Sequence, residues 1–500
     1  MNIMNAIKNQ TNYTYTENNE LAYRSSLDSV LDLFYFGGSM IKEHDKFVDL
    51  FQKAFAKAPE LAIKVLFYIR DIRGGQGVRE NFRCVIKNLA KVYPDIAKQL
   101  IEYIPEYGRY DDLYTFVGTS LEADVFGYMK KVLEQDLDNM NQGKSVTLLA
   151  KWLKSENTSS KDSVKLAKKT RKHFNMTSKE YRQTLSKLRK YIDVTEVKIS
   201  ANEWDKVEYQ KVPSRAMKLY RNAFRRHDEQ RFNQYVKDVL DGKQKMNAAT
   251  LYPHEIISKI ISKMISGFSG LREDITAEEN QLLTALWNNL PKYETKNALV
   301  VVDVSGSMFV PVYSNIKAVD VSVSLGMYVA ENNTGIYKDK FITFSESPQL
   351  QTINGKDLYS RVNSLVEADW GFNTDLMQVF DVVLRAAKEH NIAQEEMPEM
   401  IMIISDMQFD EAVSGQTSFE TIKRKFKRAG YNLPKLVYWN VAANFKGNLP
   451  VTKDEYGTFL ISGFNPVIVK YLMQNKIPTP LDLMYDIINA PRYQAIKIKL

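Results

Sequence analysis

Residues 297–308 read NALVVVDVSGSM, and this stretch decides the class of fold. The apolar run 298–302 is typical of a strand that is buried on both faces of a parallel sheet. Asp303 follows this run directly, and Ser305 and Ser307 come next on a short turn. The sequence therefore predicts a central strand with polar side chains at its carboxyl end, where open α/β sheets bind their ligands.

Helix-like and strand-like segments alternate after this strand. KAVDVSVSLGMYVAEN (317–332) and TDLMQVFDVVLRAAKEH (374–390) have helical spacing, whereas EMIMIISDM (399–407) is a second buried strand. Such alternation is typical of βα units. Residues 291–500 are therefore predicted to form a doubly wound α/β domain, with a largely parallel sheet and helices on both sides.

The chain before this domain is predicted to be helical. Residues 21–290 contain helix-length amphipathic segments that end in Gly, Pro or polar turns, and strand-like alternation is scarce. A long series of short helices favours a stack of helix pairs, as in a HEAT-like solenoid or ring. Residues 1–20 are polar, and we expect them to form a flexible arm.

Positive charge is concentrated in one part of this helical region. The net charge of the 500-residue chain is +8. Residues 151–190 alone contain thirteen Lys or Arg and three Asp or Glu, a net charge of +10, while residues 291–500 are close to neutral. Such asymmetry is typical of a protein that binds a polyanion, most often a nucleic acid.

Composition excludes several other classes of protein. Cys84 is the single cysteine, so neither an intrachain disulfide framework nor a multi-cysteine zinc site can form. The five histidines lack paired metal-ligand spacing. The first twenty residues lack the apolar segment of a signal peptide, and the chain has no apolar run of about 18 residues. We therefore expect a cytoplasmic protein that does not interact with membranes.

Three loops at the expected strand ends offer oxygen ligands. Besides the DVSGSM turn, these loops contain Asn373-Thr374-Asp375 and Ser405-Asp406. Hydroxyl and carboxylate oxygens suit a hard divalent cation that keeps some water ligands. The bound ion is expected to be Mg²⁺ or another divalent cation, although a single such turn would be unremarkable in any protein.

The three loops together resemble the metal-ion-dependent adhesion site of von Willebrand factor type A domains. The resemblance implies that the ion is coordinated by Asp303, Ser305, Ser307, Thr374 and Asp406. It also implies an open coordination position that an acidic side chain of a partner protein completes. We expect the serines to be ligands rather than nucleophiles, because no His or Lys neighbours them in sequence. The protein is therefore not expected to be an enzyme.

The basic stretch combines Lys and Arg with the aromatic residues Trp152, Phe174, Tyr181 and Tyr191. A solvated charged surface would show a similar pattern, but acidic partners at helical spacing are nearly absent. A second basic patch lies between residues 211 and 231. The candidate RNA-binding residues from both patches are Lys151, Lys154, Lys168, Lys169, Arg171, Lys172, Arg182, Lys187, Arg189, Lys190, Arg215, Arg225 and Arg226.

The helical region also resembles a known family. IRDIRGGQGVREN (69–81) reads as a helix–turn–helix linker whose charged residues, Asp71, Arg73, Arg79 and Glu80, can pair with one another. Together with the metal-site motifs, the chain is similar to TROVE proteins, the Ro autoantigen family, and is closer to an uncharacterised TROVE-like family of plants, fungi and viruses. The segments that carry this resemblance include LAKWL, EYRQTLSKLRK, VPSRAMKLYRNAFRRHDEQRF, LYPHEII, DWGFNTD and SDMQFD.

The TROVE resemblance implies a ring of helical repeats that binds single-stranded RNA ends or small structured RNA. It also implies an acidic protein partner or a nuclease as a further binding partner. The alternative from the residues themselves is a protein–protein scaffold that uses the metal site and binds no nucleic acid. A metal-dependent nuclease is disfavoured, because such sites usually cluster carboxylates around two metals.

Overall fold

The buried run at residue 298 forms the central strand of a six-stranded sheet in the computed structural model. The structure describes residues 12–267, 275–313, 315–343, 348–366, 375–411, 415–442, 448–474 and 479–499. The strand order is β12-β11-β10-β4-β8-β9, and every pairing is parallel except that of β8 with the edge strand β9. The strands are β4 (Ala298–Val302), β8 (Lys340–Thr343), β9 (Leu350–Thr352), β10 (Met400–Ser405), β11 (Lys435–Asn440) and β12 (Thr458–Ser462). The prediction of an α/β domain with a mainly parallel sheet is confirmed.

The helices of this domain include α17 (Ala318–Glu331), which packs against β4, β8 and β10. Its residues 318–330 are all buried, including Ser322, whose Oγ donates a hydrogen bond to the carbonyl of Ile404 at 3.0 Å. The remaining helices are α18 (Leu358–Val366), α19 (Leu376–Glu389), α20 (Ser418–Ala429), α21 (Val469–Gln474), α22 (Pro480–Ile488) and α23 (Pro491–Gln494).

The region before the sheet is helical, as predicted. Pro59 and Pro94 each occupy the first turn of a helix, where the missing N–H costs nothing. The helices are α2 (Ser29–Gly37), α3 (His44–Lys57), α4 (Pro59–Arg70), α5 (Glu80–Val92), α6 (Pro94–Leu100), α7 (Ile104–Tyr107), α8 (Glu122–Asn141), α9 (Leu149–Trp152), α10 (Lys161–His173), α11 (Ser178–Tyr191), α12 (Thr195–Ser200), α13 (Ser214–His227), α14 (Glu229–Leu240), α15 (Pro253–Gly267) and α16 (Ala277–Asn288). Among these residues, no helix is both long and apolar enough to cross a bilayer.

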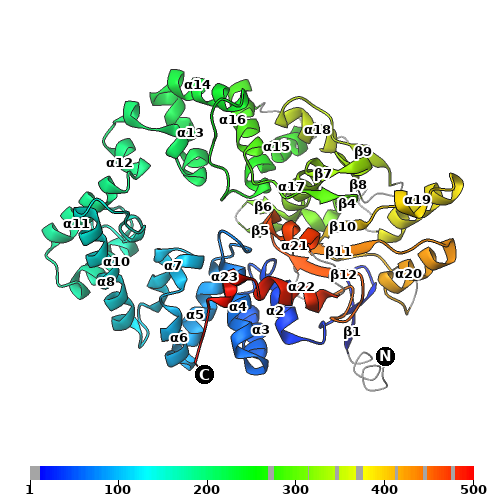
Figure 1. The fold of residues 1–500 in the computed structure, drawn as a ribbon, viewed down its shortest axis with the longest axis horizontal. Coiled ribbons are helices and arrows are strands. Elements are labelled where there is room, and N and C mark those ends of the chain that lie inside the picture. The colour runs from blue at the N-terminus through cyan, green and yellow to red at the C-terminus, as the bar shows by residue number, and fades with distance from the viewer. Residues whose placement is uncertain are drawn as a thin grey trace.

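These helices form an arc, and both of its ends rest on the α/β domain (Figure 1). At one end, α2 packs against β12, and the Gly38 N–H donates to Ser462 Oγ at 3.2 Å. At the other end, α15 packs against α17. The two ends also meet directly, because Tyr252 Oη donates to the Gln76 carbonyl at 2.9 Å. The arc and the sheet therefore make a closed ring, in which α8, α10 and α11 lie opposite the α/β domain.

The N-terminal segment is part of the fold from residue 12 onward. Strands β1 (Tyr13–Tyr15) and β2 (Leu21–Tyr23) pair antiparallel, and Thr16 Oγ1 donates to the Phe409 carbonyl at 2.8 Å. The prediction of a flexible arm is therefore wrong for residues 12–20, and residues 1–11 lie outside the described part of the chain. The partners of this segment lie about 390 positions away, so its polar sequence alone did not reveal the contact.

The glycine-rich turn joins α4 to α5, as expected, but its charged residues pair only in part with one another. Arg79 Nε donates to Glu80 Oε1 at 2.6 Å, which is the pairing that the sequence favoured. Asp71 instead accepts from Arg492 Nη2 at 2.8 Å, and Arg73 donates to the Glu106 carbonyl. A Cβ on Gly75 would lie 2.0 Å from the Tyr68 carbonyl oxygen, which explains why this position has no side chain.

Candidate metal and nucleic-acid sites

The candidate metal site lies where β4 and β10 end side by side. Because Val302 pairs with Ile404 in parallel register, the loops that follow the two strands emerge together. Asp303 is fully buried, and its two carboxylate oxygens accept from Ser405 Oγ at 2.6 Å and from the Ser305 N–H at 2.9 Å. The hydroxyl oxygens of Ser305 and Ser307 are 3.1 Å apart. Strand order thus brings together four of the five predicted ligands, and Thr374 lies outside the described residues.

The electrostatics of this site favour a cation. Burial raises the pKa of Asp303, and burial together with the charge of Asp303 raises the pKa of Asp406 to about 7. Two buried carboxylates that repel each other are stabilised by a divalent ion between them. The described residues contain no cluster of three His, Cys, Asp or Glu side chains, so a metal here depends on the serine hydroxyls as well. This set of oxygen donors fits Mg²⁺.

Two contacts near this site were not predicted from the sequence. The sequence placed Ser405 in a loop with oxygen ligands, but it did not indicate that the Ser405 hydroxyl donates to the Asp303 carboxylate. The N-terminal segment also lies beside the site, because the Glu17 N–H donates to Gln408 Oε1 at 2.9 Å. The carboxylate of Glu17 contributes to the raised pKa of Asp406. No local pattern in the sequence indicated that residue 17 would lie here.

Five of the candidate RNA-binding residues are exposed and make no ion pair or hydrogen bond with any described residue. They are Lys168, Lys172, Arg182, Lys187 and Lys190. Lys161 and Lys165 share the exposed face of α10 with the first two, since the four lysines recur at i, i+4, i+7 and i+11. Sequence reasoning left out Lys161 and Lys165, although helical spacing was sufficient to find them.

Three other candidates are engaged within the protein. Lys169 Nζ lies 2.6 Å from Glu122 Oε2, and Arg171 Nε lies 2.8 Å from Glu156 Oε1. The Arg189 guanidinium donates hydrogen bonds that connect α11 to the segment around α9. The sequence analysis considered only acidic partners at helical spacing, and Lys169 and Arg171 are instead neutralised by Glu122 and Glu156 from other elements.

The remaining candidates differ in their exposure. Arg226 is exposed, whereas Arg215 lies 3.7 Å from Glu255 and Arg225 donates to the Glu278 carbonyl. Lys151 and Lys154 are half-buried, and the Lys154 ammonium lies 5.6 Å from the centre of the Tyr114 ring. The exposed positive charge is therefore concentrated on α10 and α11 rather than on α13.

Two family models match successive parts of the chain. Residues 16–146 and 141–293 match a family described as "Domain of unknown function (DUF2828)", and residues 297–482 match "Domain of unknown function (DUF7788)". The uncharacterized protein L728 of Acanthamoeba polyphaga mimivirus is 28% identical over 523 residues, which cover 95% of this chain and 87% of that protein.

Among solved structures, the crystal structure of the Deinococcus radiodurans RO (RSR) protein aligns with a TM-score of 0.39 and 14% identity, covering 88% of this chain and 93% of that one. The prediction of an uncharacterised family with viral members is confirmed by the family match and the viral relative. Because the match to the DUF2828 model spans residues 16–293, more than half of the 500 residues, the chain belongs to the DUF2828 family.

Proposed function

We propose that this protein binds RNA through the exposed basic faces of α10 and α11. The observation that carries the proposal is the set of exposed lysines on α10, at residues 161, 165, 168 and 172, which have no partner among the described residues. The first and last of these lysines are eleven positions apart, which corresponds to about 16 Å along the helix axis, a length over which a nucleic acid strand presents several phosphates. Binding a polyanion would relieve the mutual repulsion of these lysines and release counterions.

The RNA would be a single-stranded end or a small structured RNA, as the resemblance to TROVE proteins implies. The ring arrangement supports this choice, because a ring of helices offers an extended surface rather than the compact platform of a small RNA-binding module. An acidic protein is the other polyanion to consider. A stripe of four evenly spaced lysines favours a regularly spaced chain of phosphates over the irregular charges of a protein surface.

The metal site supplies the second part of the proposed function. Asp303, Ser305, Ser307 and Asp406 would hold Mg²⁺, with Thr374 as the fifth ligand that the resemblance implies. The bound ion would offer a coordination position to a carboxylate of a protein partner. Ser405 keeps the Asp303 carboxylate oriented for this role. We propose that the protein acts by binding and performs no catalysis, so labelled RNA should stay intact when it is incubated with the protein and Mg²⁺.

RNA binding is tested by electrophoretic mobility shift at increasing salt. The variant carries Glu at Lys168, Lys172, Lys187 and Lys190, all of which are exposed. The wild-type affinity should fall steeply with salt, and the variant should bind weakly at every salt concentration. A charge-matched control carries Glu at four exposed lysines from other elements, Lys53, Lys91, Lys296 and Lys388, and should bind like the wild type.

Absence of RNA binding by the wild type at low salt would contradict the proposal. Equal losses of RNA affinity in the variant and the control would also contradict it, because they would show that binding depends on the net charge of the protein and not on the face formed by α10 and α11. The scaffold function, in which the metal site recruits an acidic partner without nucleic acid, would then remain.

A further inference from the structure

A cavity of about 400 Å³ lies beside the start of the basic stretch, between the turn after α4, α7, α8 and α9. Its walls include three half-buried aromatic side chains, Tyr110, Tyr128 and Trp152. Arg73, Arg109, Glu102 and Glu106 contribute the charged groups to the lining. This volume falls within the range of about 300–1,000 Å³ that is usual for small-ligand sites.

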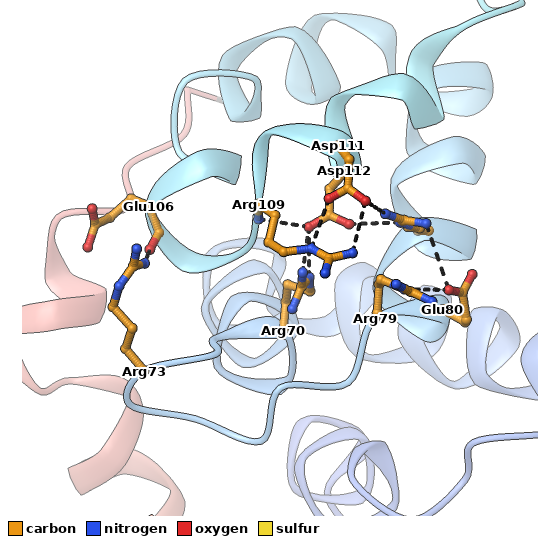
Figure 2. A network of polar contacts seen from close by, with 9 residues as sticks. Arg70, Arg73, Arg79, Glu80, Glu106, Arg109, Asp111 and Asp112 are labelled. Atoms are coloured by element: carbon orange, nitrogen blue, oxygen red, sulfur yellow. Dashed lines mark hydrogen bonds and ion pairs between the residues drawn. The ribbon is translucent and has the colours of Figure 1, made fainter. Parts of the chain in front are cut away.

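The Arg109 guanidinium lies over the ring of Trp152, with its central carbon 4.2 Å from the ring centre. Two hydrogen bonds of 2.9 Å to Asp111 hold it in this position (Figure 2). Arg83 Nη2 lies 3.2 Å from the same carboxylate. The Arg109 N–H also donates to Asp112 at 3.0 Å. Arg109 and Trp152 therefore form a stack that is already ordered in the free protein. A ligand that binds there does not have to supply the free energy of ordering these side chains.

Asp112 anchors this surface to the interior of the protein. It is fully buried and accepts a hydrogen bond from Arg70 Nη2 at 2.7 Å (Figure 2). Arg83 Nε also donates to it at 2.7 Å. Two arginines, one from α4 and one from α5, thus bind a single carboxylate in the segment that follows Arg109. Because the Asp112 carboxylate is buried between two guanidinium groups, the segment that carries Arg109 is held in place, and so is this wall of the cavity.

The charges around the cavity disfavour an ionic ligand. Arg109 directs two of its donors at Asp111, and Arg73 donates to the Glu106 carbonyl, so both arginines already have partners within the protein. Glu102 is exposed at the rim and makes no ion pair with a described residue, so it would repel an anion. The two arginines and the two glutamates of the lining offset one another, so the cavity has no net charge that would attract an ion of either sign. The lining therefore suits a flat, uncharged ring.

We propose that this cavity binds an unpaired nucleobase of the RNA by stacking on Trp152 and its aromatic neighbours. Bases of single-stranded RNA stack on aromatic rings and on guanidinium planes, which is the combination found here. Lys151 precedes Trp152 on α9 and would contact a phosphate next to such a base. This inference rests on the proposed function, because the base belongs to the strand that α10 and α11 bind.

The test compares two oligomers of equal charge, a ten-nucleotide uridine oligomer and an abasic oligomer of the same length. The wild type should bind the uridine oligomer more tightly. Trp152→Ala should lower that affinity about tenfold and leave the affinity for the abasic oligomer unchanged, since only the stacking of a base is lost. Trp152→Phe keeps a smaller ring and should show an intermediate loss.

The matched control is Trp204→Ala. Trp204 stacks on His227 at 4.4 Å in another sector of the ring, and its removal should change neither affinity. A second measurement needs no variant: a uridine oligomer with one 4-thiouridine, irradiated with the wild type, should crosslink to the peptides that contain Tyr110, Tyr128 or Trp152.

The outcomes separate this inference from the proposed function. If the wild type binds both oligomers equally and no crosslink maps to the cavity, the nucleobase site is refuted and RNA binding by the basic face stands. If the wild type binds neither oligomer at low salt, the proposed function fails as well. Equal losses of both affinities in Trp152→Ala would also refute the site, because they would indicate a structural role for the ring.

Discussion

Asp71 and Arg492 are 421 positions apart, yet Arg492 Nη2 donates to Asp71 Oδ1 at 2.8 Å. Asp71 is fully buried, and its other oxygen also accepts from Tyr493 Oη at 2.9 Å. The Arg492 guanidinium lies 4.9 Å from the centre of the Tyr107 ring. The last helix of the chain is thus fastened to the turn between α4 and α5, at the opposite end of the sequence.

Arg492→Ala should lower the free energy of unfolding by about 3 kcal/mol, because it leaves the Asp71 carboxylate buried without its cation. Urea denaturation followed by circular dichroism measures this loss. Lys423→Ala, which removes an exposed pair with Glu455, should cost less than about 1 kcal/mol. If the two variants lose the same stability, the contact between Asp71 and Arg492 does not hold the ring together.

Asp303→Asn should abolish the stabilisation of the protein by Mg²⁺. At about a hundred times its dissociation constant, the ion should stabilise the wild type by about 2.7 kcal/mol. Without Mg²⁺ the variant should be at least as stable as the wild type, because one of two repelling carboxylates is gone. Melting temperatures with and without Mg²⁺ test both statements. The control Asp381→Asn, on α19, should keep the response to Mg²⁺, and a response that persists in Asp303→Asn would exclude this site.

Glu20→Gln should change how stability depends on pH. Burial raises the pKa of Glu20 to about 7, above its usual value of 4.5. Between these values the unfolded chain has lost a proton that the folded protein still holds, so the stability of the wild type falls as pH rises through this window. The variant should lack this fall, which is on the order of 3 kcal/mol from pH 4.5 to pH 7.

Melting temperatures from pH 4.5 to pH 8 measure the effect. The curves of the wild type and Glu20→Gln should converge at the acidic end and separate above neutral pH. Glu134→Gln, at a more exposed position on α8, serves as the control and should follow the wild type. Parallel curves for all three proteins would show that Glu20 does not titrate in this range.

Arg189→Ala and Lys187→Ala should have opposite consequences, although the two residues are neighbours on α11. Arg189 donates to the carbonyls of Ala150 and Leu153 and to Ser155 Oγ at 2.7–2.8 Å, so its loss should cost about 3 kcal/mol of stability. Lys187 is exposed, and its loss should change stability by less than about 0.5 kcal/mol. It should instead reduce the salt dependence of RNA binding by about one counterion. Thermal melting and mobility shift together distinguish the two roles, and reversed results would contradict the assignment.

The elements that the sequence predicted well are those defined by local periodicity. The run 298–302 indicated a buried strand, and the second run at 400–405 indicated its neighbour. Once the two strands are adjacent and parallel, the loops with Asp303 and Asp406 must meet. The candidate metal site could therefore be assembled from the sequence for those proposed ligands that the structure describes.

Contacts between polar groups that are distant in sequence could not be predicted in this way. Lys169 appeared unpaired because Glu122 lies on another helix, and residues 12–20 appeared mobile because their partners lie near residue 409. Hydrophobic spacing reports which face of an element is buried, but a polar side chain carries no signal of which distant group it will meet. Lys187 and Arg189 look equivalent in the sequence. Their different exposure in the structure shows that Lys187 is accessible to a ligand and that Arg189 is bound within the protein.

The return of the C-terminal helix to the helical region has a consequence for how such proteins can evolve. A break between residues 293 and 297, where the two family matches meet, would leave Asp71 without Arg492 and the Gly38 N–H without Ser462. Neither half can then be exchanged with an unrelated partner as an independent module. Recombination at that boundary should be selected against, so the two halves are expected to be inherited together.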